Sequence, residues 1–332
     1  MRVQRLLGSV AVTLTYLCVA APIGAQTITV FDVPGATGTH PTSISPAGVV
    51  AGSYLDVTGA EHGFIRDKNG QITTFDAPGS IATRTLGFGH AGSVFGAYMD
   101  ANAAVHGYIR ESDGTITTFD VPGALSTFPT SINDAGEIAG TYEDEQGTHG
   151  FVRDVDGHFS SFLENVNEVS INNRGDVVGS FFDGNRSRCF IRDHKGDITI
   201  FDVGDLDSSA WDINSAGTIV GRYAERQGDL LRVHGFILDT NGNITTFDPP
   251  NAFFTTPVSI NSSGSVTGSY SASSTGKFPF GFVRDASGNI TTFRGPGFSN
   301  DTSPSDINAR GEITGSYVDP VLEVSRGFIR SK

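Results

Sequence analysis

Short runs of apolar and β-branched residues recur along the chain, separated by turns that contain glycine. In one stretch these runs are Thr42 to Ser45, Val49 to Tyr54, Gly63 to Arg66 and Ile72 to Phe75. None of them keeps the 3.6-residue apolar period of an amphipathic helix, so we expect strands and almost no helix. The pattern therefore predicts an all-β fold with four short strands per unit.

The four-strand unit repeats along nearly the whole chain. The phrase Ile-Thr-Thr-Phe-Asp recurs with variation at Ile28, Ile72, Ile116, Phe159, Ile198, Ile244 and Ile290. Two further phrases, His-Gly-Phe-Ile-Arg-Asp and Ser-Ile-Asn-x-x-Gly-x-Ile-x-Gly, recur equally often. Four strands in about 44 residues is the spacing of propeller blades. A β-solenoid is the alternative, but its rungs are usually shorter.

The two ends of the repeat array complement each other. The array opens with a lone fourth-position strand, Ile28 to Phe31, and finishes after a third-position strand, Gly327 to Arg330. Pairing of these two strands would complete the last unit and remove open sheet edges. We therefore predict a seven-bladed β-propeller of four-stranded antiparallel blades, with the ring closed by the N-terminal strand pairing with the last blade.

The first 25 residues have the order of a secretory signal peptide. Arg2 and Arg5 precede an apolar run from Leu6 to Ala21, and small residues follow as far as Ala25. We predict residues 1–25 as the signal peptide and residues 26–332 as a single propeller domain. An N-terminal membrane anchor is the alternative, but the run is short for a span. The expected location is secreted, extracellular or periplasmic, with no transmembrane segment after cleavage.

Charge and cysteine content narrow the expected partners. The formal charge is −14, and loss of Arg2 and Arg5 takes it to −16 (−14 − 2). So acidic a chain repels phosphate backbones, which excludes nucleic acid as a partner. Cleavage also removes Cys18 and leaves Cys189 alone, so no internal disulfide is expected. A divalent cation is allowed by the charge but not supported by any ligand pattern, so we expect no cofactor. We also expect a monomer.

Unequal loop lengths distinguish one face of the predicted disc from the other. The first-to-second turn and the third-to-fourth turn keep their lengths in every complete unit. The second-to-third loop varies from eight residues (Phe181 to Cys189) to twelve (Tyr223 to Gly235), and the fourth-to-first link varies as well. In an up-and-down blade these two variable connections share a face, and loops on a rigid scaffold often carry binding sites. We predict that this face is the functional one, with unselected loop drift as the alternative.

The three longest second-to-third loops belong to the fifth, sixth and seventh units, so their sector is the candidate binding site. It offers cationic and aromatic side chains from these loops and from neighbouring fourth-to-first links. The candidate binding residues are Trp211, Arg226, Arg232, Phe253, Phe254, Lys277, Phe278 and Phe280. We predict no catalytic residue and no metal ligand.

Histidine recurs near the start of the third strand, as His62, His106, His149 and His234. A propeller places these residues on separate blades, so we expect each ring to hydrogen-bond a neighbouring turn instead of sharing a metal. The chain contains no G-x-S-x-G elbow, H-E-x-x-H motif or phosphate loop, and no metal-ligand cysteine spacing.

The repeated phrases together resemble the HAF-repeat family of extracellular bacterial repeat proteins. The likeness rests on His-Gly-Phe, a glycine turn and Ser-Ile-Asn-x-x-Gly-x-Ile-x-Gly, and it covers essentially all of the chain after residue 25. His-Gly-Phe stands here where that family has His-Ala-Phe. The resemblance implies an exported repeat protein and transfers no catalytic residue.

Two functions follow from these observations. The first is a secreted or surface-associated binding scaffold that holds an extracellular glycan, peptide or envelope partner on the variable-loop face. The alternative is a propeller-type enzyme, a lyase or hydrolase with a site at the channel mouth, for which the seven-bladed streptogramin lyases are an architectural analogy. A cluster of His, Glu and Arg at the channel mouth would favour the enzyme, and a broad aromatic sector the scaffold.

Overall fold

The chain is built almost entirely of short antiparallel strands. A computed structural model describes residues 27–276, 279–298 and 301–331. These residues contain 28 strands, and their only helices are the single 3₁₀ turns His90–Gly92 and Pro296–Phe298. The predicted all-β class is therefore confirmed. The predicted signal peptide lies outside the described residues, whose helices include none long and apolar enough to cross a membrane.

The strands form four-stranded antiparallel blades in which each strand pairs with the next along the chain. The first strands are β2 (Gly38–Ile44), β6 (Ala82–Phe88), β10 (Ser126–Ile132), β14 (Val166–Ile171), β18 (Ser208–Ile213), β22 (Phe254–Ile260) and β26 (Thr302–Ile307). The second strands are β3 (Val50–Leu55), β7 (Val94–Met99), β11 (Ile138–Asp144), β15 (Val177–Phe182), β19 (Ile219–Gln227), β23 (Val266–Ser271) and β27 (Ile313–Val318). The third strands are β4 (Glu61–Arg66), β8 (Val105–Arg110), β12 (Gly147–Arg153), β16 (Ser187–Arg192), β20 (Leu230–Leu238), β24 (Phe280–Arg284) and β28 (Ser325–Ser331). The fourth strands are β5 (Ile72–Phe75), β9 (Ile116–Phe119), β13 (Phe159–Glu164), β17 (Ile198–Phe201), β21 (Ile244–Phe247) and β25 (Ile290–Phe293), and β1 (Thr27–Phe31) pairs with β28.

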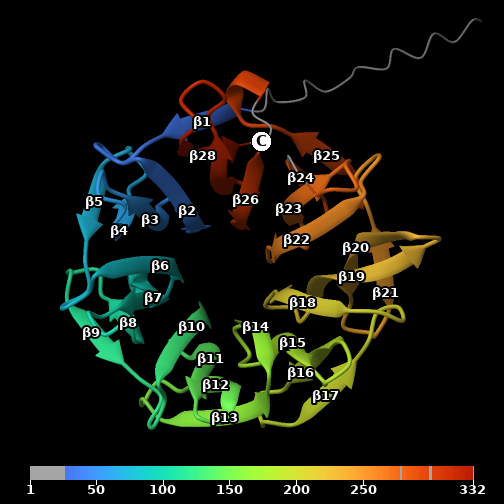
Figure 1. The fold of residues 1–332 in the computed structure, drawn as a ribbon, viewed down its shortest axis with the longest axis horizontal. Coiled ribbons are helices and arrows are strands. Elements are labelled where there is room, and N and C mark those ends of the chain that lie inside the picture. Colours follow the sequence, from blue (N-terminus) through green and yellow to red (C-terminus); the bar gives the residue numbers. More distant parts are fainter. Residues whose placement is uncertain (1–26, 277–278, 299–300, 332) are drawn as a thin grey trace, which may run out of the picture.

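Figure 1 shows the blades around a common centre, with the first strands innermost and the fourth strands at the rim. Within each blade the pairing is antiparallel, unlike the stacked rungs of a β-solenoid. Among the described residues, neighbouring blades share two parallel strand contacts, Gly38 with Ser325 and Val233 with Phe254. Strand β1 pairs antiparallel with β28 from Thr27 opposite Ser331 to Phe31 opposite Gly327. The two ends of the repeat array are therefore adjacent.

The first strands are longer than the sequence pattern suggested. Strand β2 begins at Gly38, four residues before the predicted start at Thr42. The added residues pair regularly with β3 up to Pro41, and the register shifts between Pro41 and Ser43. Similar shifts recur in the other first strands. An alternating apolar pattern could not reveal this bulge, because it offsets the two halves of the strand by one residue.

Packing between blades explains the phrases that recur. The aromatic residue of each third strand is fully buried at 0% exposure: Phe64, Tyr108, Phe151, Phe190, Phe236, Phe282 and Phe328. Phe236, for example, meets Phe201 of the preceding blade edge-on, with ring centroids 6.4 Å apart. A β-carbon on Gly221 of the second strand would collide with the carbonyl oxygen of Ser209 and the ring of Phe236. Glycine at this position thus lets the inner strand and the buried ring approach the second strand closely.

Candidate functional site

The blades have two different faces. We call the face with the second-to-third loops and the fourth-to-first links the loop face, and the opposite one the turn face. Most of the exposed large apolar side chains lie on the loop face: Val57, Ile81, Leu125, Phe182, Leu230, Leu231, Val318, Val321 and Leu322. Among the other described ones, Val155 lies on the turn face, and Ile198, Ile200 and Ile244 lie on rim strands. Exposed apolar surface of this kind is typical of interaction sites.

The longest second-to-third connection is a strand extension and not an irregular loop. Strands β19 and β20 each have nine residues, and their pairing continues out to Gln227 opposite Leu230. Arg226 therefore lies in β19 and is exposed, while Arg232 lies in β20. The guanidinium carbon of Arg232 lies 4.7 Å from the ring centroid of Phe253. Its Nε is buried and has no hydrogen-bond partner.

Phe253 and Phe254 hold the link between two blades. Their ring centroids are 5.5 Å apart, and both side chains are half-buried. The backbone N–H of Phe253 donates to the carbonyl of Ser271 at 2.6 Å, and the N–H of Val233 donates to the carbonyl of Phe253 at 3.2 Å. The link is therefore fixed by the hairpin β19–β20 on one side and by β23 on the other.

A second aromatic–arginine contact lies on the neighbouring blade. The ring of Phe280, the first residue of β24, lies 5.3 Å from that of Tyr270. The guanidinium of Arg294, the residue after β25, lies 4.0 Å from the Phe280 centroid in the same blade. Lys277 and Phe278 lie outside the described residues. Five predicted binding residues thus occupy the loop-face side of the adjacent blades β18–β21 and β22–β25: Arg226, Arg232, Phe253, Phe254 and Phe280.

Trp211 is not on a loop, contrary to the prediction that it belongs to a fourth-to-first link. It is the bulge residue of the inner strand β18, between Ala210 and Asp212. It lines the central channel, and the guanidinium of Arg222 stacks 5.1 Å from its ring. Trp211 aligns with Thr42 at the predicted start of the first strand, and the register shift at both positions breaks the alternation that would have placed it in the strand.

The recurring histidines contact aspartate carboxylates, whereas we expected each ring to hydrogen-bond a neighbouring turn. Nδ1 of His62 lies 2.8 Å from Asp76 after the fourth strand, and Nε2 lies 3.5 Å from Asp56 in the second-to-third loop. The ring also stacks on Tyr54, with centroids 5.1 Å apart. Burial lowers the pKa of His62, but the hydrogen bonds and charges of Asp76 and Asp56 outweigh burial and raise it overall.

In other blades the histidine position is occupied by arginine, or both the histidine and its aspartate are replaced together. Arg188 donates from Nε and Nη2 to the carboxylate of Asp202, at 2.9 and 2.7 Å. Arg326 binds Asp32 in the same way, which joins the end of the repeat array to its beginning. Where Phe280 replaces histidine, Arg294 replaces the aspartate, so the ion pair becomes a cation–ring contact. These contacts tie the third strand to the connection that follows the fourth.

The central channel is lined by every first strand, through the half nearest the turn face. The lined cavity measures about 320 Å³ and includes Asp212 and Asp306. Asp306 accepts from the hydroxyls of Ser43 and Ser259 at 2.8 and 2.9 Å, so it bridges β2 and β22. Burial, with a contribution from the Asp306 charge, raises the pKa of Asp212. These two carboxylates therefore link neighbouring blades through hydrogen bonds.

A second ring of bonds uses the asparagine of Ser-Ile-Asn. Its Oδ1 accepts from the backbone of its own turn, and Asn133 for example accepts from the N–H of Ala135 at 3.1 Å. Its Nδ2 also donates to the next blade, from Asn133 to the carbonyl of Asn172 at 3.1 Å and from Asn308 to that of Ser45 at 3.0 Å. Sequence reasoning missed this second bond, because only the assembled blades bring the two turns together.

One inner-strand position varies in chemistry while its neighbours do not. Its carbonyl packs against the second-strand glycine, and the residues there are His40, Arg84, Phe128, Glu168, Ser209, Thr256 and Ser303. Their side chains are half-exposed or exposed, whereas the flanking residues of each strand are mostly buried. The position lies on the half of the strand nearest the loop face. Aligning the repeats on Ser-Ile-Asn would have revealed it, two or three residues upstream of that phrase.

His40, Glu61 and Arg84 form a charged cluster at this end of the inner strands. Arg84 donates from Nε and Nη2 to Glu61 at 2.9 and 3.0 Å. Burial and the charge of Arg84 lower the pKa of His40, while the charge of Glu61 raises it, and the net direction is downward. The lowered pKa favours the neutral imidazole of His40 at pH 7. Glu61, Arg84 and Phe128 also line a cavity of about 200 Å³.

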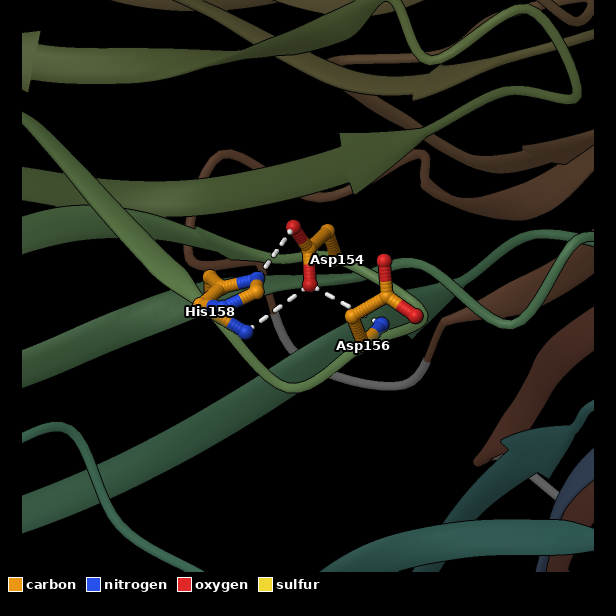
Figure 2. Close-up of side chains that lie close together, drawn as sticks. All are labelled: Asp154, Asp156 and His158. Atoms are coloured by element: carbon orange, nitrogen blue, oxygen red, sulfur yellow. Dashed lines mark hydrogen bonds and ion pairs between the residues drawn. The ribbon is translucent and has the colours of Figure 1, made fainter.

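Asp154, Asp156 and His158 lie together in one third-to-fourth turn (Figure 2). Oδ1 of Asp154 accepts from the N–H groups of Asp156 at 3.0 Å and of His158 at 2.8 Å. Asp67 accepts in the same way from positions two and four residues on. The cluster is thus the ordinary turn of this repeat, and its side chains are mostly exposed.

Comparisons with known proteins show the fold. No protein-family model and no curated protein matches the chain, so the HAF-repeat resemblance stays a prediction. A structure of catalytically inactive virginiamycin B lyase from Staphylococcus aureus with quinupristin matches 92% of this chain and 100% of its own, at 16% identity and a TM-score of 0.63. Oligogalacturonate lyase from Vibrio parahaemolyticus matches 92% and 97%, at 10% identity and a TM-score of 0.57. The β-propeller domain of the Trilobed protease from Pyrococcus furiosus matches 74% and 82%, at 14% identity and a TM-score of 0.55.

These similarities support a propeller-like fold for this chain. At such low identity they carry no activity with them.

Proposed function

We propose that the mature chain is an exported, seven-bladed propeller that binds an extracellular glycan or protein on its loop face. Closure of the ring by β1 is part of this proposal. It is supported by the pairing of β1 with β28, by the ion pair of Arg326 with Asp32, and by the Asn308 bond to Ser45 across the same junction. Export is inferred from the N-terminal sequence alone.

The observation that carries the binding proposal is the asymmetry between the two faces. Turn-face connections are uniform in length, and backbone groups within each turn hydrogen-bond one another. Loop-face connections differ in length, carry most of the exposed apolar side chains, and include two arginine–phenylalanine stacks on adjacent blades. A rigid ring with one variable face is a scaffold for recognition.

The test is a binding screen of residues 26–332 against glycans, cell-envelope polymers and extracellular proteins. Phe253→Ala is expected to weaken any binding that the wild type shows, because its ring belongs to the loop face. The control is Val155→Ala, which removes an exposed apolar side chain from the turn face. Equal affinity of wild type and Phe253→Ala, or a loss only in Val155→Ala, would reject this placement.

A second candidate function is supported by the cluster of His40, Glu61 and Arg84. A neutral imidazole can accept a proton, and a guanidinium beside it can stabilise a developing negative charge. His40 and Arg84 lie on the inner strands β2 and β6 near the loop face, and Glu61 begins the third strand β4. This is the end of the channel at which we expect the site of a lyase or hydrolase. Arg84 is already paired with Glu61, so a substrate anion would have to share or displace that carboxylate.

The enzyme hypothesis has a separate test. Residues 26–332 are assayed for cleavage of the ligands found in the binding screen, with His40→Gln as the variant. The hypothesis expects turnover that falls at least about 100-fold in His40→Gln while binding is retained. Turnover that is absent, or unchanged in the variant, excludes His40 as a catalytic base.

A further inference from the structure

Most described arginines have a partner that accounts for them. Six form ion pairs with carboxylates: Arg84, Arg174, Arg186, Arg188, Arg310 and Arg326. Six lie at the end of a third strand and stack on a fourth-strand aromatic of the preceding blade: Arg66, Arg110, Arg153, Arg192, Arg284 and Arg330. Both groups serve the repeat itself.

The remaining described arginines are Arg222, Arg226, Arg232 and Arg294. None has a carboxylate within ion-pair distance among the described residues, although the chain carries a formal charge of −14. All four belong to the adjacent blades β18–β21 and β22–β25. Arg222 lies beside the channel against Trp211, and the other three lie toward the loop face.

The phenylalanine contacts orient two of these cations without neutralising them. Arg232 and Arg294 stack on Phe253 and Phe280, at 4.7 and 4.0 Å from the ring centroids. Glu225 stands opposite Arg232 in the hairpin, but its carboxylate lies 3.3 Å from Nε2 of His234. A guanidinium stacked by one face on a ring keeps N–H groups on its edge for a carboxylate. In Arg232 these are the Nη groups, because its Nε is buried.

We propose that this sector binds an acidic polysaccharide built of uronate units, which deepens and rests on the proposed loop-face binding. A uronate carries a carboxylate for a guanidinium edge and, on the same ring, an apolar C–H face for half-exposed phenylalanine. A linear chain repeats both features, so one polymer can contact Arg226, Arg232 and Arg294 across two blades. A neutral glycan leaves these cations unmatched. An acidic peptide offers carboxylates without the adjoining apolar face.

The test measures affinity of residues 26–332 for four probes: polygalacturonate, neutral dextran, dextran sulfate and poly-L-glutamate. The inference expects polygalacturonate to bind most tightly and dextran not at all. Arg294→Gln is expected to weaken polygalacturonate binding about tenfold, because one charge-assisted hydrogen bond is lost. The Arg294 side chain is exposed, although it contacts Phe280, so the melting temperature of the variant is measured to show that the fold is retained. The control is Arg174→Gln, which removes an exposed arginine from the turn face and should change nothing.

Each other outcome overturns the uronate inference, and it also shows whether the proposed loop-face binding fails with it. Equal binding of poly-L-glutamate or dextran sulfate replaces uronate recognition by general anion binding. Binding of a neutral glycan that is lost in Phe253→Ala but kept in Arg294→Gln refutes the anionic ligand and preserves loop-face binding. An equal loss in Arg174→Gln, or polygalacturonate binding that neither loop-face variant weakens, refutes the inference and the loop-face site together. Failure to bind polygalacturonate refutes the inference alone when another ligand from the screen depends on Phe253.

Discussion

Replacing Asp306 by alanine tests whether the channel carboxylates hold blades together. The carboxylate accepts from Ser43 Oγ at 2.8 Å, Ile44 N–H at 2.9 Å and Ser259 Oγ at 2.9 Å, and from its own neighbour Ile307 N–H at 2.7 Å. Three of these bonds therefore cross to other blades. Hydrogen bonds to a charged group contribute about 1.5–3 kcal/mol each, but the two hydroxyls can turn to water in the channel. We expect Asp306→Ala to lower the free energy of unfolding by about 3–4 kcal/mol.

The assay is equilibrium urea unfolding, followed by the fluorescence of Trp211, the only tryptophan in the chain. Trp211 lines the same channel, so its emission reports on this region directly. Ser305→Ala is the matched control, because Ser305 also lines the channel and has no side-chain hydrogen bond among the described residues. That variant should stay within about 0.5 kcal/mol of wild type. If Asp306→Ala lowers the free energy of unfolding by less than about 1 kcal/mol, or if the control lowers it equally, Asp306 does not link the blades as described.

Three further predictions follow from the packing and from the chain ends. The pKa of His62 is raised, so its pairing with Asp76 stabilises the fold below pH 6.5, and this stability is lost as the pH rises through the folded-state pKa. His62→Gln should flatten the unfolding free energy across that pH range, and an unchanged slope in urea melts at several pH values would count against the pairing. Gly221→Val should cost about 3 kcal/mol or more, because its side chain meets the Ser209 carbonyl and the Phe236 ring; a melting temperature equal to that of wild type would exclude the collision. Deletion of residues 26–32 exposes the edge of β28 and removes Asp32, one of the two carboxylates that pair with Arg326. Size-exclusion chromatography should then show association, and a monomer with unchanged melting would argue against closure by β1.

The repeat phrases predicted the all-β class and the antiparallel four-strand blade because each phrase reports a local constraint. The third-strand aromatic is a buried anchor, the second-strand glycine admits a close approach, and the turn glycine takes a positive φ, as at Gly136 with 93°. Such constraints act within a few residues, so they remain visible in the sequence. Strand ends were less predictable, and β2 starts before Thr42 because its bulge breaks the alternation.

The candidate site was only partly accessible from the sequence. Loop length indicated the sector that holds Arg232 and Phe253, but the stack between them depends on the extended hairpin and on the link from the next blade. We assigned Trp211 to a link instead of a strand, because the bulge at Trp211 breaks the alternating pattern of the first strand. The cluster of His40, Glu61 and Arg84 brings together residues from two blades, and no local phrase encodes that meeting.

The most direct test of loop-face binding is hydrogen–deuterium exchange of residues 26–332, with and without the tightest ligand from the binding screen. The proposal predicts slower exchange in residues 224–233, 249–254 and 272–276, with the turns of the opposite face unchanged. Protection confined to the turns around Asn133, Asn172 and Asn308, or to the rim strands β5, β9 and β17, would contradict it.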